Sequence, residues 1–307
     1  MKILVLMSTY NGARYLAEQI DSVLAQDIRQ TATLELLVRD DGSTDSTHEI
    51  LNRYQAENKL TWYTGSNLRP EKSFWHLLQN APDADFYAFC DQDDYWHPDK
   101  LSRAVAKLTE LSEPSLPLLY CSAFIATDEH RNPISVEKNP LNRYTDYAHA
   151  LIYSTAPGCT FVFNRAARQA AMQYDMERNQ VVIHDWLIHK IVTILGGRMV
   201  YDPEARIDYR QHGNNAIGVH ATGLGDFTAR VRRFLSGSGR QTRSRCARAL
   251  LDVYGRQVSP EVLWALELVA NYPSDLRLKV AFWKDRRFLT GTVNDLFLKI
   301  LILMDVL

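Results

Sequence analysis

Short apolar runs alternate with segments of helical periodicity along the first two thirds of the chain. The run Lys2–Ser8 predicts a buried strand, and residues 12–26 repeat apolar side chains on one face of a helix. The same alternation predicts further strands at Leu34–Val38, Leu60–Tyr63, Phe86–Cys90, Leu118–Ile125, Thr160–Phe163 and Met199–Tyr201. Strands that alternate with helices are typical of an α/β fold with a mostly parallel sheet flanked by helices.

The pattern changes after Gly213, where glycine-punctuated, arginine-rich helical segments run to the end of the chain. We therefore expect two regions, an α/β domain at 1–220 and a helical, Arg-rich C-terminal extension at 221–307. Within the first region, Pro98 favours the N1 position of a helix whose apolar stripe begins at Leu101.

The composition is that of an ordinary globular protein, with 46% hydrophobic and 23% charged residues and a net charge of −1. Disordered regulators and Cys-dense secreted scaffolds are excluded, and without a global basic field we expect no nucleic-acid partner. The charges are nevertheless segregated: residues 83–100 contain six Asp and one Lys, and residues 227–250 contain seven Arg and no acid.

The four cysteines are widely spaced and form no CxxC pair, which indicates buried thiols in a reducing cytoplasm. The apolar run Ile3–Met7 is too short for a signal peptide, and no stretch reaches the ~18 apolar residues of a membrane span. We therefore expect a cytoplasmic location.

Three polar clusters follow predicted strands: residues 8–11, residues 40–41 and residues 91–94. Ligands of an open parallel sheet bind beyond the carboxyl ends of its strands, so all three clusters are expected to face one crevice. Any one cluster is also explained as a turn or a helix cap. The third is the most informative, because closely packed carboxylates raise each other's pKa unless a cation is present. Oxygen ligands of this kind suit Mg²⁺ or Mn²⁺.

Together, Ser-Thr-Tyr-Asn-Gly at 8–12, Asp-Asp-Gly-Ser-Thr-Asp at 40–45 and Cys-Asp-Gln-Asp-Asp-Tyr-Trp at 90–96 resemble the motifs of family 2 glycosyltransferases with the GT-A fold. The resemblance covers about residues 1–215. The longer run at 90–101 and Tyr-Arg-Gln-His-Gly-Asn-Asn at 209–215 are similar to the bacterial rhamnosyltransferase branch. That branch builds cell-wall or O-antigen polysaccharides from dTDP-L-rhamnose.

The resemblance implies positions for the nucleotide-sugar donor. It implies that Thr9, Tyr10 and Asn11 line the nucleotide pocket. It further implies that Asp40 and Asp41 contact the base and its surroundings, with Asp41 accepting from an imide N–H.

The resemblance also implies a metal site. Asp91-Gln92-Asp93 matches the DxD motif, in which Asp93 is the main ligand of Mn²⁺ or Mg²⁺, and Asp91 and Gln92 lie at the donor, with Asp91 near both ribose and metal. In the later motif, Arg210 would offset diphosphate charge and His212 would ligate the metal or contact phosphate. A single histidine in a loop is equally well explained as a residue without a functional role.

Inverting transfer requires a carboxylate that takes the proton of the acceptor hydroxyl. Asp185 lies at the start of a predicted helix, where it is equally well explained as an N-terminal cap. The family places its base at a corresponding helix start, often after Glu, and here His184 occupies that preceding position. The resemblance therefore implies that Asp185 is the base, with Trp186 as an apolar platform for the acceptor sugar.

The resemblance thus implies metal-dependent, inverting transfer of a sugar, L-rhamnose from dTDP-rhamnose, onto a cell-surface glycan or lipid-linked glycan. A UDP-hexose donor and a non-catalytic assembly subunit of the same fold remain alternatives. A dinucleotide oxidoreductase is disfavoured because no GxGxxG follows the first strand, and a sugar-nucleotide pyrophosphorylase because no Gly-rich phosphate loop does.

The arginine run at 227–250 is explained either as a solvated helix face or as a segment that docks on anionic lipid. Apolar residues from Phe288 to Met304 then recur at helical spacing, which suits a membrane interface or a homodimer through the C-terminal helices. A lipid-linked acceptor would make membrane docking useful, so we expect the protein at the inner face of the cytoplasmic membrane.

Overall fold

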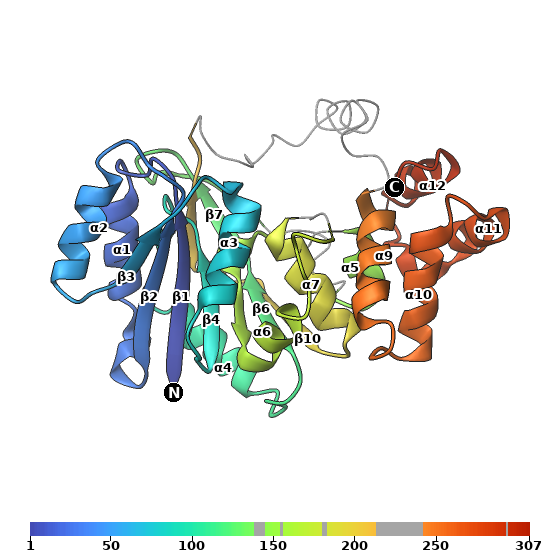
Figure 1. Cartoon of the computed structure of the whole chain (residues 1–307), viewed down its shortest axis with the longest axis horizontal. Coiled ribbons are helices and arrows are strands. Elements are labelled where there is room, and N and C mark those ends of the chain that lie inside the picture. Colours follow the sequence, from blue (N-terminus) through green and yellow to red (C-terminus); the bar gives the residue numbers. More distant parts are fainter. Residues whose placement is uncertain (138–144, 154–155, 180–182, 213–241, 293) are drawn as a thin grey trace.

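The computed structural model describes residues 1–137, 145–153, 156–179, 183–212, 242–292 and 294–307. A seven-stranded sheet forms the centre of the molecule (Figure 1). Its strands are β1 (Lys2–Thr9), β2 (Thr33–Asp40), β3 (Thr61–Thr64), β4 (Phe86–Cys90), β6 (Leu118–Ser122), β9 (Val162–Asn164) and β10 (Arg198–Asp202). Their order across the sheet is β10-β6-β9-β4-β1-β2-β3, with only β9 antiparallel to its neighbours. The expected α/β fold with a mostly parallel sheet is confirmed.

Helices cover both faces of this sheet, which is why its central strands are apolar on both sides. In β1, Ile3, Val5 and Met7 face one core, whereas Leu4 and Leu6 face the other, because successive side chains of a strand point to opposite faces. One face is covered by α1 (Leu16–Leu24), α2 (Thr47–Ala56) and α4 (Lys100–Thr109). The other is covered by α3 (Arg69–Asn80), α6 (Arg165–Ala171) and α7 (His184–Ile194).

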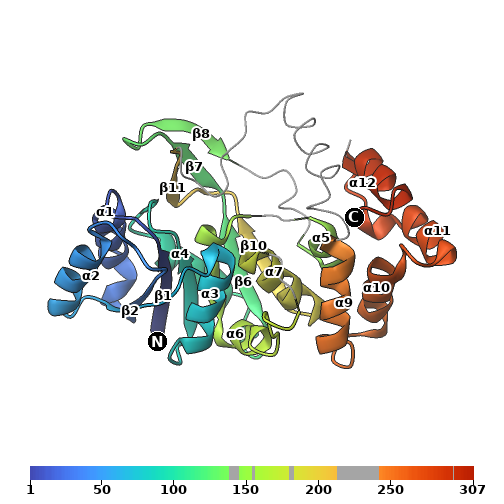
Figure 2. The same ribbon diagram turned by 45° about the horizontal axis from the view of Figure 1, so that its top comes forward.

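A second, four-stranded sheet lies beside the main one, and Figure 2 shows three of its strands together at the top of the view. In the order β5-β11-β7-β8, its strands are β5 (Tyr95–Trp96), β11 (Ile207–Arg210), β7 (Phe124–Thr127) and β8 (Pro133–Glu137). The single strand expected at Leu118–Ile125 is therefore wrong. The main-sheet strand β6 ends at Ser122, the backbone N–H of Ala123 donates to the carbonyl of Asp202 at 2.9 Å, and the chain then enters the second sheet.

The order of the main sheet produces a crevice. The chain builds β1, β2 and β3 outward on one side and then returns to place β4 on the other side of β1. The carboxyl ends of β1 and β4 thus lie next to each other at a topological switch point, where open α/β sheets bind their ligands.

The start of α4 differs from the expectation. Its first residue is Lys100, so Pro98 precedes the helix instead of occupying its N1 position. Asp99 stands at the N-cap without a capping hydrogen bond from its side chain, and its carboxylate instead accepts from Arg206 Nε at 2.8 Å. The tertiary ion pair takes the place of the local cap.

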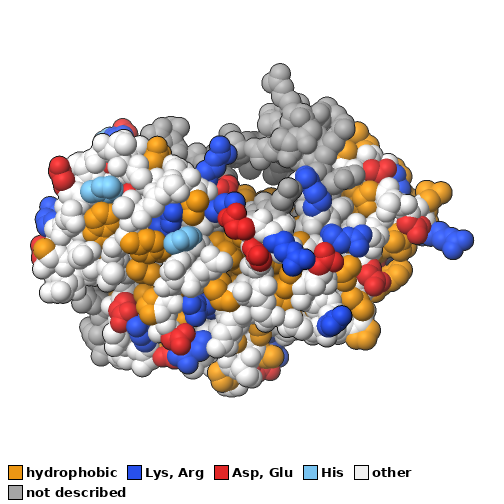
Figure 3. All heavy atoms as spheres, viewed as in Figure 1, with side chains coloured by type: hydrophobic (Ala, Val, Ile, Leu, Met, Phe, Trp, Pro, Cys, Tyr) orange, Lys and Arg blue, Asp and Glu red, His pale blue; other side chains and the backbone are white. Residues whose placement is uncertain are grey.

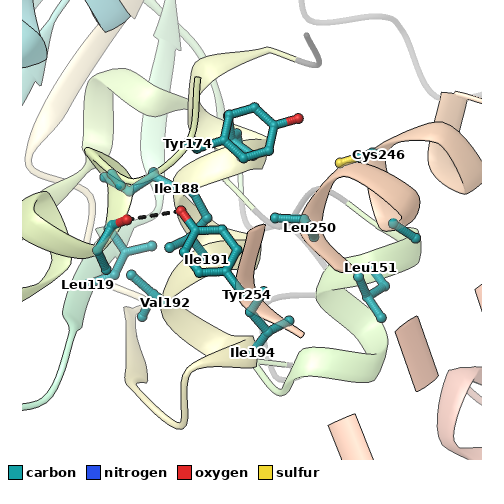
Figure 4. Packing of buried hydrophobic residues seen from close by; sticks show 14 of the residues in the cluster. Leu119, Leu151, Tyr174, Ile188, Ile191, Val192, Ile194, Cys246, Leu250 and Tyr254 are labelled. Carbon is teal, nitrogen blue, oxygen red and sulfur yellow. Dashed lines mark hydrogen bonds between the residues drawn. The ribbon is translucent and has the colours of Figure 1, made fainter. Parts of the chain in front are cut away.

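The C-terminal helices continue the hydrophobic core of one sheet face. Figure 4 shows Leu250 and Tyr254 lying together with Ile191 in this core, and the Tyr254 hydroxyl donates to the carbonyl of Ala170 at 2.9 Å. The C-terminal helices are α9 (Thr242–Tyr254), α10 (Pro260–Asn271), α11 (Leu276–Lys284) and α12 (Asn294–Leu303), and α5 (Tyr147–Ile152) belongs to the same core. The expected boundary near residue 220 lies outside the described residues.

Two further expectations concern the apolar residues. All four cysteines are buried free thiols, as predicted. The helix expected to begin near Phe288 begins instead at Asn294, and Phe288 is a fully buried residue of the short 3-10 helix Arg286–Phe288. Within the described ranges, no helix has the length and hydropathy needed to cross a membrane.

Candidate active site

The loops after β1 and β4 are joined by one side chain, that of Gln92. Its Oε1 accepts from Thr9 Oγ1 at 2.7 Å and from the Tyr10 backbone N–H at 2.9 Å, and its Nε2 donates to the Tyr10 carbonyl at 3.2 Å. A Cβ atom at Gly12 would lie 2.2 Å from Gln92 Oε1, so the Gln92 side chain keeps this position only beside a glycine. The polar clusters after the two strands are thus brought together, as expected from the parallel sheet.

Two pockets share Tyr10, Gln92 and Asp93 in their linings. The first has a volume of about 420 Å³ and is lined by Ser8, Tyr10, Asp41, Asn67, Arg69, Pro70, Phe74, Asp91, Gln92, Asp93 and Tyr209. The second, of about 590 Å³, is lined by Tyr10, Asn11, Gly12, Arg14, Tyr15, Gln92, Asp93, Asp128, Glu129, Gln211 and His212.

Asp41 lines the first pocket, whereas Asp40 is fully buried and does not line it. The Asp41 carboxylate accepts from the Leu68 backbone N–H at 2.9 Å and is ion-paired with the buried Arg39. The fully buried Asp40 carboxylate accepts from the backbone N–H of Ser43 at 2.9 Å and lies 2.7 Å from His48 Nε2. Burial alone would raise the Asp40 pKa, but these hydrogen bonds outweigh it and hold that pKa below its usual value. Asp40 therefore shapes the loop that carries Asp41.

Arg69 also lines the first pocket, although it belongs to none of the motifs in the sequence. Its backbone has a φ of 63°, a left-handed conformation that is uncommon outside glycine, and its N–H donates to Asn67 Oδ1 at 3.0 Å. Strained backbone of this kind clusters at functional sites. The available sequence signal was Pro70, because proline restricts the residue before it.

The acidic loop after β4 places its three aspartates at different depths. Asp91 and Asp93 line the first pocket, and Asp94 is fully buried, with Oδ1 accepting from the Arg210 backbone N–H at 3.2 Å. Burial, together with the carboxylates of Asp93 and Asp185, raises the pKa of Asp91 to about 7. A cation at this loop would relieve the repulsion among these carboxylates.

The atoms that could ligate a metal fall into two groups. Carboxylate oxygens of Asp91 and Asp94 and the Cys159 thiol all lie within 4.8 Å of one another. The Nε2 of His212 lies 2.9 Å from Asp93 Oδ2, and its ring is stacked on Tyr15 with the centroids 5.3 Å apart. Asp94 Oδ2, fully buried, has no hydrogen-bond partner among the described residues. The carboxylate oxygens fit Mg²⁺ or Mn²⁺, whereas the Cys159 thiol is a soft ligand that neither ion prefers.

Arg210 lies behind the acidic loop, with only 3% of its surface exposed. Its Nε donates to the Asp93 carbonyl at 2.9 Å, its Nη1 to the Glu129 carbonyl at 2.7 Å and its Nη2 to Glu18 Oε2 at 2.6 Å. The guanidinium also lies 4.4 Å from the centre of the Tyr15 ring. Arg210 thus fastens the acidic loop, the β7–β8 turn and α1 to one another, and it lines neither of the two pockets.

Asp185 lies in the first turn of α7, where 6% of its surface is exposed. Its Oδ2 accepts from the Gly158 backbone N–H at 3.0 Å, and its Oδ1 accepts from the Trp186 N–H at 2.7 Å. Burial raises the Asp185 pKa to about 6, and its charge contributes to the raised pKa of Asp91. A Cβ at Gly158 would lie 2.9 Å from His184 Nε2 and 3.0 Å from Asp185 Cβ, so this close approach requires glycine.

The neighbours of Asp185 in sequence point in other directions. His184 is stacked on Phe74 with the centroids 4.3 Å apart, and burial lowers its pKa to about 3, so it is neutral at physiological pH. The Trp186 ring lies 5.5 Å from Lys190 Nζ and 6.0 Å from Arg243 Cζ, and it lines neither of the two pockets. Trp186 is therefore directed toward α9.

The arrangement of the sheet and the position of this acidic loop are those of the GT-A fold, and solved structures of similar fold agree. TarS 1–349 of Staphylococcus aureus in complex with UDP-GlcNAc matches with a TM-score of 0.56 at 19% identity, covering 99% of this chain and 80% of that one. The mannosyltransferase PcManGT from Pyrobaculum calidifontis in complex with GDP-Man and Mn²⁺ matches with a TM-score of 0.53 at 16% identity, over 99% and 86% of the two chains.

The family described as "Glycosyl transferase family 2" matches residues 4–169, more than half of the chain, and the chain belongs to that family. The dTDP-rhamnosyl transferase RfbG of Shigella flexneri is 24% identical over 309 residues, which cover 96% of this chain and 99% of RfbG. The poly(ribitol-phosphate) β-N-acetylglucosaminyltransferase TarS of Staphylococcus aureus is 30% identical over 115 residues, covering 36% of this chain and 19% of TarS.

Proposed function

We propose that this glycosyltransferase is metal-dependent and inverting, and that it moves L-rhamnose from dTDP-rhamnose onto a glycan acceptor. One observation carries the choice of donor: the similarity to a dTDP-rhamnosyl transferase extends over 96% of this chain and 99% of that protein. The aligned region spans nearly the whole of both chains, so the similarity is not limited to the motifs that the family shares.

In this proposal the nucleotide occupies the first pocket. Tyr10 and Asp41 line it, with Asp41 facing the base, and Thr9 and Asn11 belong to the loop that closes against Gln92. Asp40 acts through the loop that it hydrogen-bonds. Because Arg69 also lines this pocket, it adds a positive charge near the donor that the motifs did not indicate.

Asp93 and Asp91 would hold Mn²⁺ or Mg²⁺, with His212 beside Asp93 as a further ligand. A bound divalent ion supplies neutralisation of the charge that develops on the leaving diphosphate. Arg210 supports this arrangement through its bonds to the Asp93 carbonyl and to Glu18, and its charge adds to the positive potential behind the diphosphate.

Asp185 acts as the general base and takes the proton of the acceptor hydroxyl as the new glycosidic bond forms. A pKa of about 6 suits this role, because the carboxylate is ionised at neutral pH yet more basic than an exposed aspartate. Trp186 would contact the acceptor sugar from the α9 side of the site.

We propose that the acceptor is a lipid-linked glycan and that the enzyme works at the inner face of the cytoplasmic membrane. The region 221–307 would then serve membrane docking or dimer formation. Of the arginine run, Arg230, Arg232, Arg233 and Arg240 lie outside the described residues, whereas Arg243 donates to the Ile152 carbonyl at 2.6 Å.

A UDP-hexose donor is the second candidate, and it is favoured by the similarity to TarS, whose structure contains UDP-GlcNAc. A non-catalytic assembly subunit is the third. The three differ in what they turn over, so a single assay separates them.

The test is a screen of nucleotide-sugars with a lipid-linked glycan, with and without Mn²⁺, on wild type, Asp185→Asn and Asp93→Asn. We expect turnover of dTDP-rhamnose, abolished by chelation and lowered about 10²–10⁴-fold by Asp185→Asn. Asp83→Asn is the matched control, because Asp83 is exposed at the opposite end of β4. If only a UDP-sugar is turned over, the donor is that UDP-sugar and not dTDP-rhamnose. Wild-type rates in both Asp185→Asn and Asp93→Asn would refute the proposed roles of these two residues.

A further inference from the structure

The helices α11 and α12 carry exposed apolar side chains at helical spacing. On α11 these are Leu276, Val280 and Trp283, and on α12 and just after it Leu296, Ile300, Leu303 and Met304, each between 38% and 74% exposed. Seven of the twelve large apolar residues that are exposed in the described part of the chain thus lie on two adjacent helices. We name these seven residues the α11–α12 surface.

The two helices contact each other beside these exposed apolar side chains. Lys299 of α12 lies with its Nζ 4.8 Å from the centre of the Trp283 ring of α11. Figures 1 and 2 both place α11 and α12 side by side at one end of the molecule, and Figure 3 shows apolar side chains reaching the surface in this part. The contact between Lys299 and Trp283 joins the outward faces of both helices.

This surface is not needed to complete the hydrophobic core. Each helix already buries its opposite face, through Phe282 on α11 and through Leu298, Leu301 and Ile302 on α12. The outward residues therefore cost solubility without stabilising the monomer, and large exposed apolar patches with a polar rim mark interaction sites.

The charges around the surface are predominantly basic. Residues 275–305 contain six Lys or Arg and four Asp. Asp285 is ion-paired with Arg287 and Asp305 with Lys279. Asp275 accepts from the backbone N–H groups at the start of α11, and Asp295 accepts from those of Thr290 and Gly291. Arg277, Lys284, Arg286 and Lys299 have no carboxylate within ion-pair distance among the described residues.

We propose that the α11–α12 surface docks on an anionic lipid bilayer, with its apolar side chains in the acyl boundary and the four basic residues at the headgroups. Helices of this kind lie in the interface when an apolar face combines with a basic one. Charge complementarity favours lipid over a second copy of this chain, because a self-interface would place two basic rims against each other. Trp283, capped by Lys299, has the amphipathic character of interfacial aromatic residues.

Docking here would bring the active site to a lipid-linked acceptor, and in that use alone the inference rests on the proposed function. Lipid binding itself requires neither nucleotide-sugar nor glycan. It is therefore measured separately from sugar transfer, and the two proposals can fail independently.

The experiment is co-sedimentation with vesicles of phosphatidylcholine alone and of phosphatidylcholine with phosphatidylglycerol. We expect wild type to sediment only with the anionic vesicles, and the double variant Trp283→Ser/Leu296→Ser to lose this binding. Lys284→Gln/Arg286→Gln should weaken it about 25-fold, or about fivefold for each basic residue. Trp264→Ser is the matched control, since Trp264 is an exposed tryptophan on α10 outside the surface.

Unchanged thermal unfolding of the variants and unchanged transfer to a water-soluble acceptor would show that the fold and the active site are intact. Wild type that ignores anionic vesicles, or a double variant that binds them as well as wild type does, would overturn the proposal. A wild-type dimer in gel filtration that Trp283→Ser/Leu296→Ser dissociates would assign the surface to self-association instead.

Discussion

Arg210→Lys tests whether Arg210 holds the site together or contacts the donor. The arginine donates to three acceptors in three different parts of the chain, namely the Asp93 carbonyl, the Glu129 carbonyl and the Glu18 carboxylate. Lysine keeps the positive charge but carries a single nitrogen, so it can replace at most one of these bonds well.

The expected loss of stability follows from the two bonds that remain unmade. A hydrogen bond to a charged group contributes about 1.5–3 kcal/mol, so two would contribute about 3–6 kcal/mol without relaxation. The Glu18 side chain is 42% exposed, and solvent screening reduces its share. We therefore expect the free energy of unfolding to fall by about 2–4 kcal/mol, which shifts the urea midpoint by about 1 M.

The same change should weaken metal binding. His212, two residues after Arg210, lies with its Nε2 2.9 Å from Asp93 Oδ2. Arg210 holds the Asp93 carbonyl by a hydrogen bond and is close to His212 along the chain, so it positions both partners of this pair. We expect a higher Mn²⁺ requirement in titration calorimetry with bound nucleotide and a lower kcat. Arg206→Lys is the control for loss of an arginine ion pair, because Arg206 is bound to Asp99 outside the site. An unchanged urea midpoint with only a raised KM for the donor would refute the reasoning and place Arg210 on the diphosphate.

Three further predictions concern the same site. Gly158→Ala puts a Cβ 2.9 Å from His184 Nε2 and 3.0 Å from Asp185 Cβ. We expect this contact to displace the Asp185 carboxylate, which lowers kcat about 10²-fold and leaves the KM for the donor unchanged. The same contact should lower the free energy of unfolding by about 1–3 kcal/mol. Because the Asp185 pKa is raised from 3.8 to about 6, kcat/KM of the wild type should fall as pH decreases below about 6. The folded protein then binds this proton more tightly than the unfolded chain, so the stability that Asp185 contributes at low pH is lost as pH rises from about 4 to 6. The asparagine of Asp185→Asn does not titrate and loses nothing over this range. In thermal unfolding, the stability of Asp185→Asn minus that of wild type should therefore be larger at pH 8 than at pH 4. In Gln92→Glu, the new carboxylate cannot donate to the Tyr10 carbonyl and repels its oxygen. The affinity for the nucleotide-sugar donor, measured by calorimetry, should therefore fall. An unchanged affinity would show that the contact between Gln92 and Tyr10 does not shape the pocket.

The elements closest to prediction are the strands buried on both faces. The bounds expected for β4, Phe86–Cys90, agree with the structure, and β1 extends one residue beyond its expected end. Such strands appear as continuous apolar runs because helices cover both sides of a parallel sheet. Polar residues directly after them must then lie at one edge, which is why the meeting of the two clusters, through Thr9 and Gln92, was predictable.

The surroundings of Asp185 were not predictable in the same way. Gly158 and Cys159 approach it and the acidic loop from a short 3-10 helix whose sequence has no periodic pattern. The division between β6 and β7 was missed for a related reason: both parts are apolar, and only their different partners, β10 and β11, separate them.

The sequence by itself determined the class of fold, the strand ends that carry polar residues and the family to which the chain belongs. These features are local, because period and motif depend on neighbouring residues along the chain. Only the tertiary structure decided that Arg210 points inward, that Gln92 joins two loops and that α11 and α12 expose their apolar faces. Each of these depends on which distant segment packs against the residue, and packing partners leave no periodic mark in the sequence.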